Sequence, residues 1–243
     1  MVNKKTANKP YDLSLTSIGR GILLLLIPIT AYILSALPAV IFLFYTFNIL
    51  QLSGVLFSTV ATIILFISFV LFLISEIFIP ALFIRIFNIK TPYGTHELSI
   101  TDKAFFNHML FFLLYRPALL CTSIIPLVPL RLRLLKIVGL KIGNESMIAG
   151  TELIDEPYGV EIGTNTLIGG LSTIFAHISR EKLYMKKVKI GNHCFIGNKS
   201  VIMPGVTIED HVIIEPGTVV GEDQVLKEGK RYHGNPAVEI KKT

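Results

Sequence analysis

The stretch VKIGNHCFIGNKSVIMPGVTIEDHVIIEPGTVV, residues 188–220, decides the fold. It divides into units of six residues, and the first position is always aliphatic: Ile190, Ile196, Ile202, Ile208, Ile214 and Val220. The fifth position is small or β-branched. Because it lies two residues before the next first position, both positions face the same side of an extended chain. A period of six does not keep to one face of an α-helix. We therefore expect short strands with a corner after each, wound into a three-sided coil.

The same pattern begins further upstream and is interrupted twice. An earlier run starts at Ile142, Ile148 and Ile154, slips by two residues, and resumes at Ile162, Ile168 and Ile174. The second interruption holds AHISREKLYMKKV, which is too long for a corner and predicts an insertion that projects from the coil. Glycine follows the aliphatic residue in several units, where we expect tight corners to favour it. These positions are 143, 163, 169, 191, 197 and 221.

The N-terminal part of the chain has a different composition. The chain is 51% hydrophobic, its mean hydropathy is +0.62, and no charged residue lies between Arg20 and Glu76. The apolar segments 21–47 and 54–84 are each long enough to cross about 30 Å of hydrocarbon as a helix. With a turn at 48–54, they predict a transmembrane helical hairpin.

Basic residues flank these segments, and the turn between the segments has none. Lys and Arg beside a span favour the cytoplasmic side and anionic headgroups, so we expect both termini in the cytoplasm and no nucleic-acid partner. A cleaved signal peptide with SALPA as its weak cleavage site is the alternative, but the apolar run is too long and a second span follows. The flanking residues are Lys4, Lys5, Lys9, Arg20, Arg85, Lys90, Arg131, Arg133, Lys136 and Lys141.

A third apolar stretch, residues 104–130, contains Arg116 and three prolines. Arg is costly in lipid and Pro breaks helices, so we expect a bent helical hairpin lying in the interface. Arg116 is a candidate for contacting a lipid phosphate, or it extends to the surface without a ligand. We interpret His108 as an interfacial polar residue. The expected division is 1–100 for the tail and two spans, 101–138 for the interfacial hairpin, and 139–243 for the β domain with an inserted loop at 175–189 and a C-terminal tail.

Three segments carry a family resemblance: IFAHISREKLY at 174–184, the stretch 188–220, and HGNPAVEIKK at 233–242. The chain resembles the hexapeptide-repeat acyltransferases, in particular the maltose, galactoside and xenobiotic acetyltransferases. That resemblance implies a left-handed parallel β-helix. The membrane part resembles the anchored terminal domains of ε-poly-lysine-type synthetases, so the expected fold class is an α-helical transmembrane hairpin plus an all-β left-handed β-helix.

The resemblance also implies a site. His177 matches the family's general base, a task that suits imidazole because its pKa lies near 6.5. The implied donor is acetyl-CoA, bound along the outside of the coil. Lys241 and Lys242 are candidate phosphate contacts, because Gly221, Glu222 and Val238 replace residues that relatives use. The other implied donor-binding residues are Phe195, in place of a Trp, and Gly197, Asn198, Ser200, Pro204 and Gly205.

We expect no metal site and no role for the cysteines. His193 and His211 lie one coil apart and should stack, but the related zinc-binding carbonic anhydrases need a histidine pair of different spacing. We interpret the two histidines as exposed or interface residues. Cys121 and Cys194 form neither a disulfide framework nor a zinc motif, and we expect both to be inert packing residues.

The sequence therefore predicts a membrane-anchored, homotrimeric acetyltransferase. It would move an acyl group from acetyl-CoA to a hydroxyl or amine of a small-molecule or lipid-linked acceptor at the membrane. The alternatives are a non-catalytic trimeric scaffold, transfer of an acyl or aminoacyl group from a carrier-protein thioester, and a metal lyase of the carbonic anhydrase kind.

Overall fold

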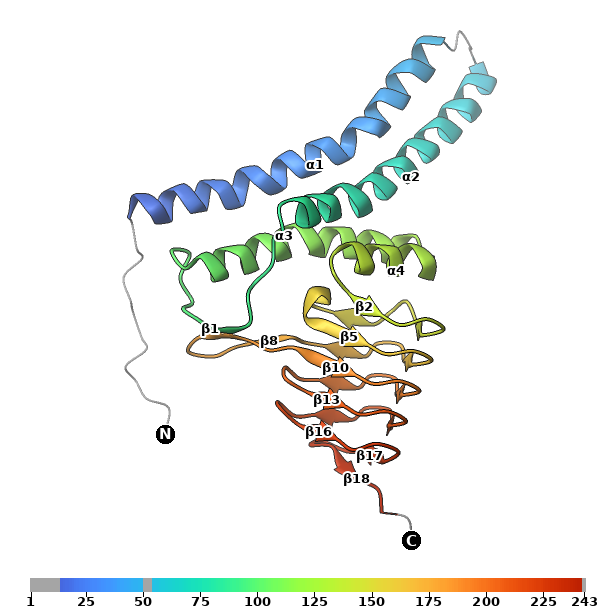
Figure 1. The fold of residues 1–243 in the computed structure, drawn as a ribbon. Helices are drawn as coiled ribbons and strands as arrows, with labels where there is room; N and C mark the ends of the chain where they lie inside the picture. Colours follow the sequence, from blue (N-terminus) through green and yellow to red (C-terminus); the bar gives the residue numbers. More distant parts are fainter. Residues whose placement is uncertain (1–13, 50–53, 242–243) are drawn as a thin grey trace.

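The computed structural model describes residues 14–49 and 54–241, so part of the expected turn at 48–54 and the basic residues Lys4, Lys5, Lys9 and Lys242 lie outside the described residues. Within the described residues, four α-helices precede the β domain (Figure 1). They are α1 (Leu15–Ile49), α2 (Gly54–Ile86), α3 (Lys103–Ile124) and α4 (Val128–Ile137).

The β domain is a three-sided parallel β-helix in which each strand pairs with a strand one coil away. After the insertion, paired residues are 18 apart in the sequence, as Ile190 with Ile208 and Ile196 with Ile214. The first side holds β2 (Lys141–Ile142), β5 (Val160–Ile162), β10 (Val188–Ile190), β13 (Thr207–Ile208) and β16 (Val225–Leu226). The second side holds β3 (Met147–Ile148), β6 (Leu167–Ile168), β11 (Phe195–Ile196), β14 (Ile213–Ile214), β17 (Arg231–His233) and the antiparallel β18 (Val238–Glu239). The third side holds β4 (Leu153–Ile154), β7 (Thr173–Ile174), β12 (Val201–Ile202) and β15 (Val219–Val220).

The predicted inward positions form the core. Apart from Ile142, which is half-buried, every first-position residue of the two runs is at most 4% exposed. The fifth-position residues Thr166, Ser172, Cys194, Ser200 and Thr218 are buried with them. Burial of each first-position Ile or Val side chain stabilises the fold by about 1.5–3 kcal/mol, so the repeat itself is the main source of stability in this domain.

Five of the six glycines after the aliphatic positions, all except Gly221, are required for a different reason from the one expected. Their backbone is not in the left-handed region; that conformation falls two residues later, as at Asn165 and His193, with φ of 51° and 55°. Instead, the backbone of the neighbouring coil occupies the space where a side chain would stand. A Cβ at Gly163 would lie 2.5 Å from Asn192 Oδ1 and 2.7 Å from the carbonyl carbon of Gly191.

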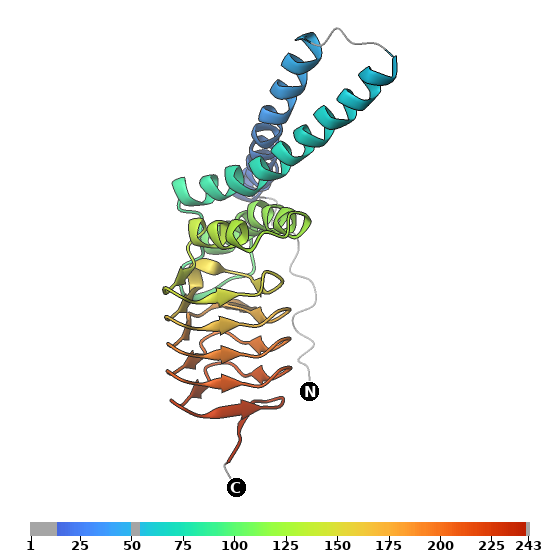
Figure 2. The ribbon, with the colours of Figure 1, turned by 90° about the vertical axis from the view of Figure 1, so that its right-hand side faces the viewer.

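The helices form two layers above the β-helix (Figures 1 and 2). Helices α3 and α4 lie directly on the first coil, and α1 and α2 lie beyond them. The Tyr115 hydroxyl in α3 donates to the Ile154 carbonyl at 2.7 Å, and Arg131 in α4 pairs with Glu152 at 2.8 Å. The interpretation of Arg131 as a membrane-flanking charge is wrong, because its side chain is buried in this ion pair.

Helices α1, α2 and α3 each have the length and apolar composition needed to cross a membrane. In α3, half of the most apolar stretch is buried within the protein, compared with about a fifth in α1 and just over a quarter in α2. Asp102 caps α3 by accepting hydrogen bonds from the backbone N–H groups of Ala104 and Phe105. Pro117 leaves α3 unbroken, and the bend falls after Ile124, before Pro126 and Pro129.

We predict that Gly163→Ala destabilises the β-helix by about 1–3 kcal/mol, because the added methyl overpacks two adjacent coils. Thermal unfolding of the purified protein measures the effect. Gly221→Ala is the matched control, since its nearest neighbour would be a flexible side-chain atom, Gln224 Oε1, at 3.8 Å. Equal melting temperatures for the two variants would contradict the close-approach explanation.

Candidate functional site

The two interruptions of the repeat meet at one corner of the coil, the corner that follows the third side. The two-residue slip after Ile154 forms a turn that contains Asp155, Glu156 and a short 3-10 helix, Pro157–Gly159. The long insertion leaves the coil one turn further on, after β7. Since coils stack in register, the turn lies directly beside the start of the insertion.

The insertion is a β-hairpin rather than an irregular loop. Its strands are β8 (His177–Ser179) and β9 (Leu183–Met185), and β1 (Gly94–His96) from the segment before α3 pairs with β9. Ion pairs join the hairpin and its base to a lower coil, from Arg180 to Glu222 and from Lys186 to Asp223. Glu222, one of the departures from the family pattern, thus has a structural partner in the hairpin.

Glu156 is the buried carboxylate of this corner. It is fully buried; its Oε2 accepts a hydrogen bond from the Ala176 backbone N–H at 3.0 Å, and its Oε1 pairs with His177 Nδ1. A carboxylate at Nδ1 fixes the orientation of the ring and leaves Nε2 as the nitrogen that can accept a proton from a ligand. The His177 side chain remains 19% exposed, so the site is not sealed.

The environment of His177 shifts its pKa upward. Burial lowers the pKa, but the contact with the Glu156 carboxylate and the charges of Glu156 and Asp155 outweigh that effect, so the pKa lies above 6.5. The conjugate acid is therefore stabilised at the position where a general base would collect a proton.

His108 of α3 lies against His177, with 4.7 Å between the ring centroids. It is 5% exposed, and burial, followed by the charge of His177, lowers its pKa to about 3. Its Nδ1 lies 3.5 Å from the Thr91 hydroxyl. The interpretation of His108 as an interfacial polar residue is wrong, because α3 packs this side chain onto the β-helix.

Arg116 of α3 closes the corner from the other side. It forms an ion pair with Asp155 at 2.5 Å, and its guanidinium lies 5.2 Å from the centre of the Phe112 ring. Burial and the charge of Glu156 raise the pKa of Asp155 to about 6, while Arg116 acts in the opposite direction. Arg116 thus has a carboxylate partner that the sequence did not predict, while its side chain remains 43% exposed.

An apolar groove of about 330 Å³ begins beside this corner and extends toward α1. It is lined by Tyr32 of α1 and by Met109, Phe112, Leu113, Arg116 and Pro117 of α3. Phe112 also packs against His177, with 5.8 Å between ring centroids. The groove therefore connects the His177 corner with the outer helix layer.

The expected donor-binding residues are not brought together within one chain. Pro204 and Gly205 occupy the His177 corner one coil below the hairpin, because Phe175 hydrogen-bonds to Ile202 of β12. Phe195 lies on the second side, Gly197 and Asn198 lie at the next corner, and Lys241 is exposed near the C-terminal end. Ser200 points inward, where its hydroxyl donates to the Glu215 carbonyl at 3.2 Å, so only its backbone is available to a donor.

The remaining sequence candidates are exposed or inert. His193 and His211 stack as expected, with centroids 4.9 Å apart and an interplanar angle of 2°, and both are exposed at a different corner. Cys121 and Cys194 are free and buried. Burial raises the pKa of both thiols, that of Cys121 to about 11, which disfavours the nucleophilic thiolate.

One cluster at the site has the composition of a metal centre. Ligand atoms of His108, Glu156 and His177 lie within 4.8 Å of one another. Both Glu156 oxygens already have partners, however, one of them on His177 Nδ1. In this cluster Glu156 orients the His177 imidazole. The expectation of a metal-free site stays a prediction.

Comparisons with known proteins concern the β-helix. Residues 187–222 match the family described as bacterial transferase hexapeptide (six repeats). Over 100 residues the chain is 36% identical to YvoF of Bacillus subtilis (strain 168), which bears an acetyltransferase name, covering 40% of this chain and 57% of that protein. It is 37% identical over 78 residues to the galactoside O-acetyltransferase of Escherichia coli (strain K12), covering 29% of this chain and 38% of that protein.

Among solved structures, the hexapeptide-repeat-containing acetyltransferase VCA0836 from Vibrio cholerae aligns with a TM-score of 0.40 at 18% identity, covering 47% of this chain and 80% of that one. The two curated relatives are covered over 57% and 38% of their own length, so the chain matches only part of each of them. The family model and the two curated relatives support a hexapeptide-repeat β-helix of the acetyltransferase type.

We predict that Glu156→Gln lowers the pKa of His177 by about 1–3, because it removes the negative charge at Nδ1 while burial remains. Titration of the histidine NMR signals measures the pKa, with the His177 signal assigned by its loss in His177→Gln. In Glu222→Gln, which removes the partner of Arg180, the pKa of His177 should stay at the wild-type value. An unchanged His177 pKa in Glu156→Gln would contradict the assigned pairing.

Proposed function

We propose that this protein is a membrane-anchored acetyltransferase that uses acetyl-CoA, with His177 as the general base. The observation that carries the proposal is the buried Glu156 carboxylate at His177 Nδ1, which orients an otherwise accessible imidazole. The acetyltransferase names of the curated relatives support the reaction class.

In this reaction His177 acts on the acceptor. The imidazole takes the proton of a hydroxyl or amine as that group attacks the thioester carbonyl carbon, and the histidinium is stabilised by Glu156. The new C–O or C–N bond forms, the C–S bond breaks, and the proton passes to the departing thiolate. Glu156 is a positioning residue in this scheme, since it acts through His177.

The donor would lie between two copies of the chain. Of the expected donor-binding residues, Pro204 and Gly205 share the His177 corner, whereas Phe195, Gly197 and Asn198 occupy other parts of the coil. A trimer in which the His177 corner of one copy faces the second side of its neighbour would bring both groups to one cleft. Lys241 and Lys242 are proposed to contact the phosphates of CoA.

The acceptor is proposed to be an amphiphile at the cytoplasmic face of the membrane. The groove between α1 and α3 supports this, because its apolar lining starts at Tyr32 in the helix pair proposed to span the membrane and ends at Phe112, against His177. A hydroxyl or amine on such a molecule would reach His177 while its apolar part lies in the groove.

We predict that His177→Ala lowers the rate of acetyl transfer by about 10²–10⁴-fold, the usual contribution of a general base. The assay follows CoA release from acetyl-CoA by the purified full-length protein with a membrane extract as the source of acceptor. His193→Ala, at an exposed position on another corner, should keep the wild-type rate. Equal rates in His177→Ala and the wild type would exclude His177 as the base.

A further inference from the structure

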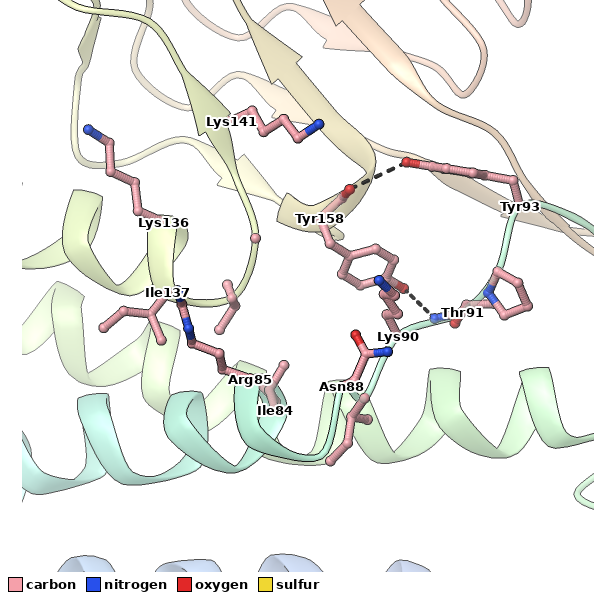
Figure 3. A pocket seen from close by; sticks show the side chains of 14 residues that line it. Ile84, Arg85, Asn88, Lys90, Thr91, Tyr93, Lys136, Ile137, Lys141 and Tyr158 are labelled. Carbon is pink, nitrogen blue, oxygen red and sulfur yellow. Dashed lines mark hydrogen bonds between the residues drawn. The ribbon is translucent and has the colours of Figure 1, made fainter.

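A second cavity, of about 610 Å³, lies between the helix layers and the first coil (Figure 3). Its walls come from the end of α2 and the segment that follows it, the end of α4, the start of β2 and Tyr158 of the 3-10 turn. Hydrogen bonds fix one wall: the Thr91 backbone N–H donates to the Tyr158 hydroxyl, and the Tyr93 hydroxyl donates to the Tyr158 carbonyl. A volume in this range is typical of ligand sites.

The cavity is strongly basic. Arg85, Lys90, Lys136 and Lys141 line it, and no acidic side chain does so among the described residues. Lys141 is paired with Glu161 at 2.8 Å. Within residues 14–49 and 54–241, no carboxylate lies at ion-pair distance from the other three cations.

The helix dipoles account for the positions of only two of these four basic residues. Arg85 and Lys136 lie in the last turns of α2 and α4, where a cation is favourable. Lys90 and Lys141 lie outside the helices, yet the fold brings them to the same cavity. Two pairs of basic residues that are far apart in the sequence thus line one cavity, and Arg and Lys are the side chains that commonly bind phosphate in proteins.

We propose that this cavity binds the phosphate of an anionic membrane lipid. Its place supports a lipid as the source, because it lies at the cytoplasmic end of α2, at headgroup depth if α1 and α2 span the membrane as proposed. Ile84, Ile137 and Val138 supply apolar contacts beside the cations, which suit the first carbons of the acyl chains.

The proposed lipid site adjoins the His177 corner, and its four cations are not part of that corner. Tyr158 lines the cavity and belongs to the turn that carries Glu156. Thr91 lines it as well, and its hydroxyl lies 3.5 Å from His108. A bound headgroup would therefore stabilise the turn and the segment that hold the two histidines in place.

The test compares lipid retention by three proteins in neutral detergent, measured by native mass spectrometry with dioleoylphosphatidylglycerol and dioleoylphosphatidylcholine. The pocket variant combines Arg85→Gln, Lys90→Gln and Lys136→Gln, all at exposed positions whose change should leave the fold intact. The matched control combines Lys103→Gln, Arg133→Gln and Lys189→Gln, which remove the same charge from exposed positions outside the cavity. We expect the wild type and the control to retain phosphatidylglycerol over phosphatidylcholine, and the pocket variant to bind it at least about tenfold more weakly.

Equal loss of phosphatidylglycerol in the pocket variant and the control would overturn the proposal. Displacement of the lipid by inorganic pyrophosphate from both the wild type and the control would support phosphate as the recognised group. Pyrophosphate binding without phosphatidylglycerol retention would assign the cavity to a soluble phosphate and overturn the lipid assignment. None of these readouts requires acetyl transfer, so failure here is distinguishable from failure of the proposed function.

Discussion

Glu156 is fully buried, and a carboxylate in that position must be paired or hydrogen-bonded to remain charged. Both of its oxygens have partners on the inserted hairpin, the Ala176 N–H and His177 Nδ1. Because the first comes from the backbone and the second from the side chain, the carboxylate fixes where the hairpin leaves the coil and how the imidazole is turned. The site therefore depends on this one buried anion, and the β-helix supplies the rigid register that holds it there.

The helical cap completes the site. Helix α3 places His108 and Phe112 against His177, and Arg116 against Asp155. Burial lowers the pKa of His108, so this side chain contacts His177 as a neutral imidazole and adds no second positive charge beside it. The same helix contacts α1 and α2 on its other side, so that any chemistry at His177 takes place close to the proposed membrane anchor.

Much of the β-helix could be predicted because the six-residue period repeats the same local rule at every coil: Ile196 faces inward for the reason that Ile214 does. The partners of His177 could not be predicted, because Glu156 belongs to an earlier coil and reaches His177 only when the coils stack. The one sequence feature that pointed to these partners was the two-residue slip in the repeat, which contains Asp155 and Glu156. His108 and Arg131 were misinterpreted for a shared reason: apolar helices near a membrane segment look lipid-facing, whereas α3 and α4 bury these two side chains against the rest of the protein. The glycine positions in the repeat were correctly predicted. Five of the six are required because neighbouring coils approach them closely, and the sequence of one six-residue unit does not show that contact.

The most direct test of the Glu156–His177 base is the pH profile of kcat/KM for acetyl transfer. A general base must be neutral to act, so the rate should rise with pH through the pKa of His177. The account predicts a midpoint above 6.5 in the wild type and a lower midpoint in Glu156→Gln, with Glu222→Gln unchanged. A midpoint that is the same in Glu156→Gln and the wild type would contradict it.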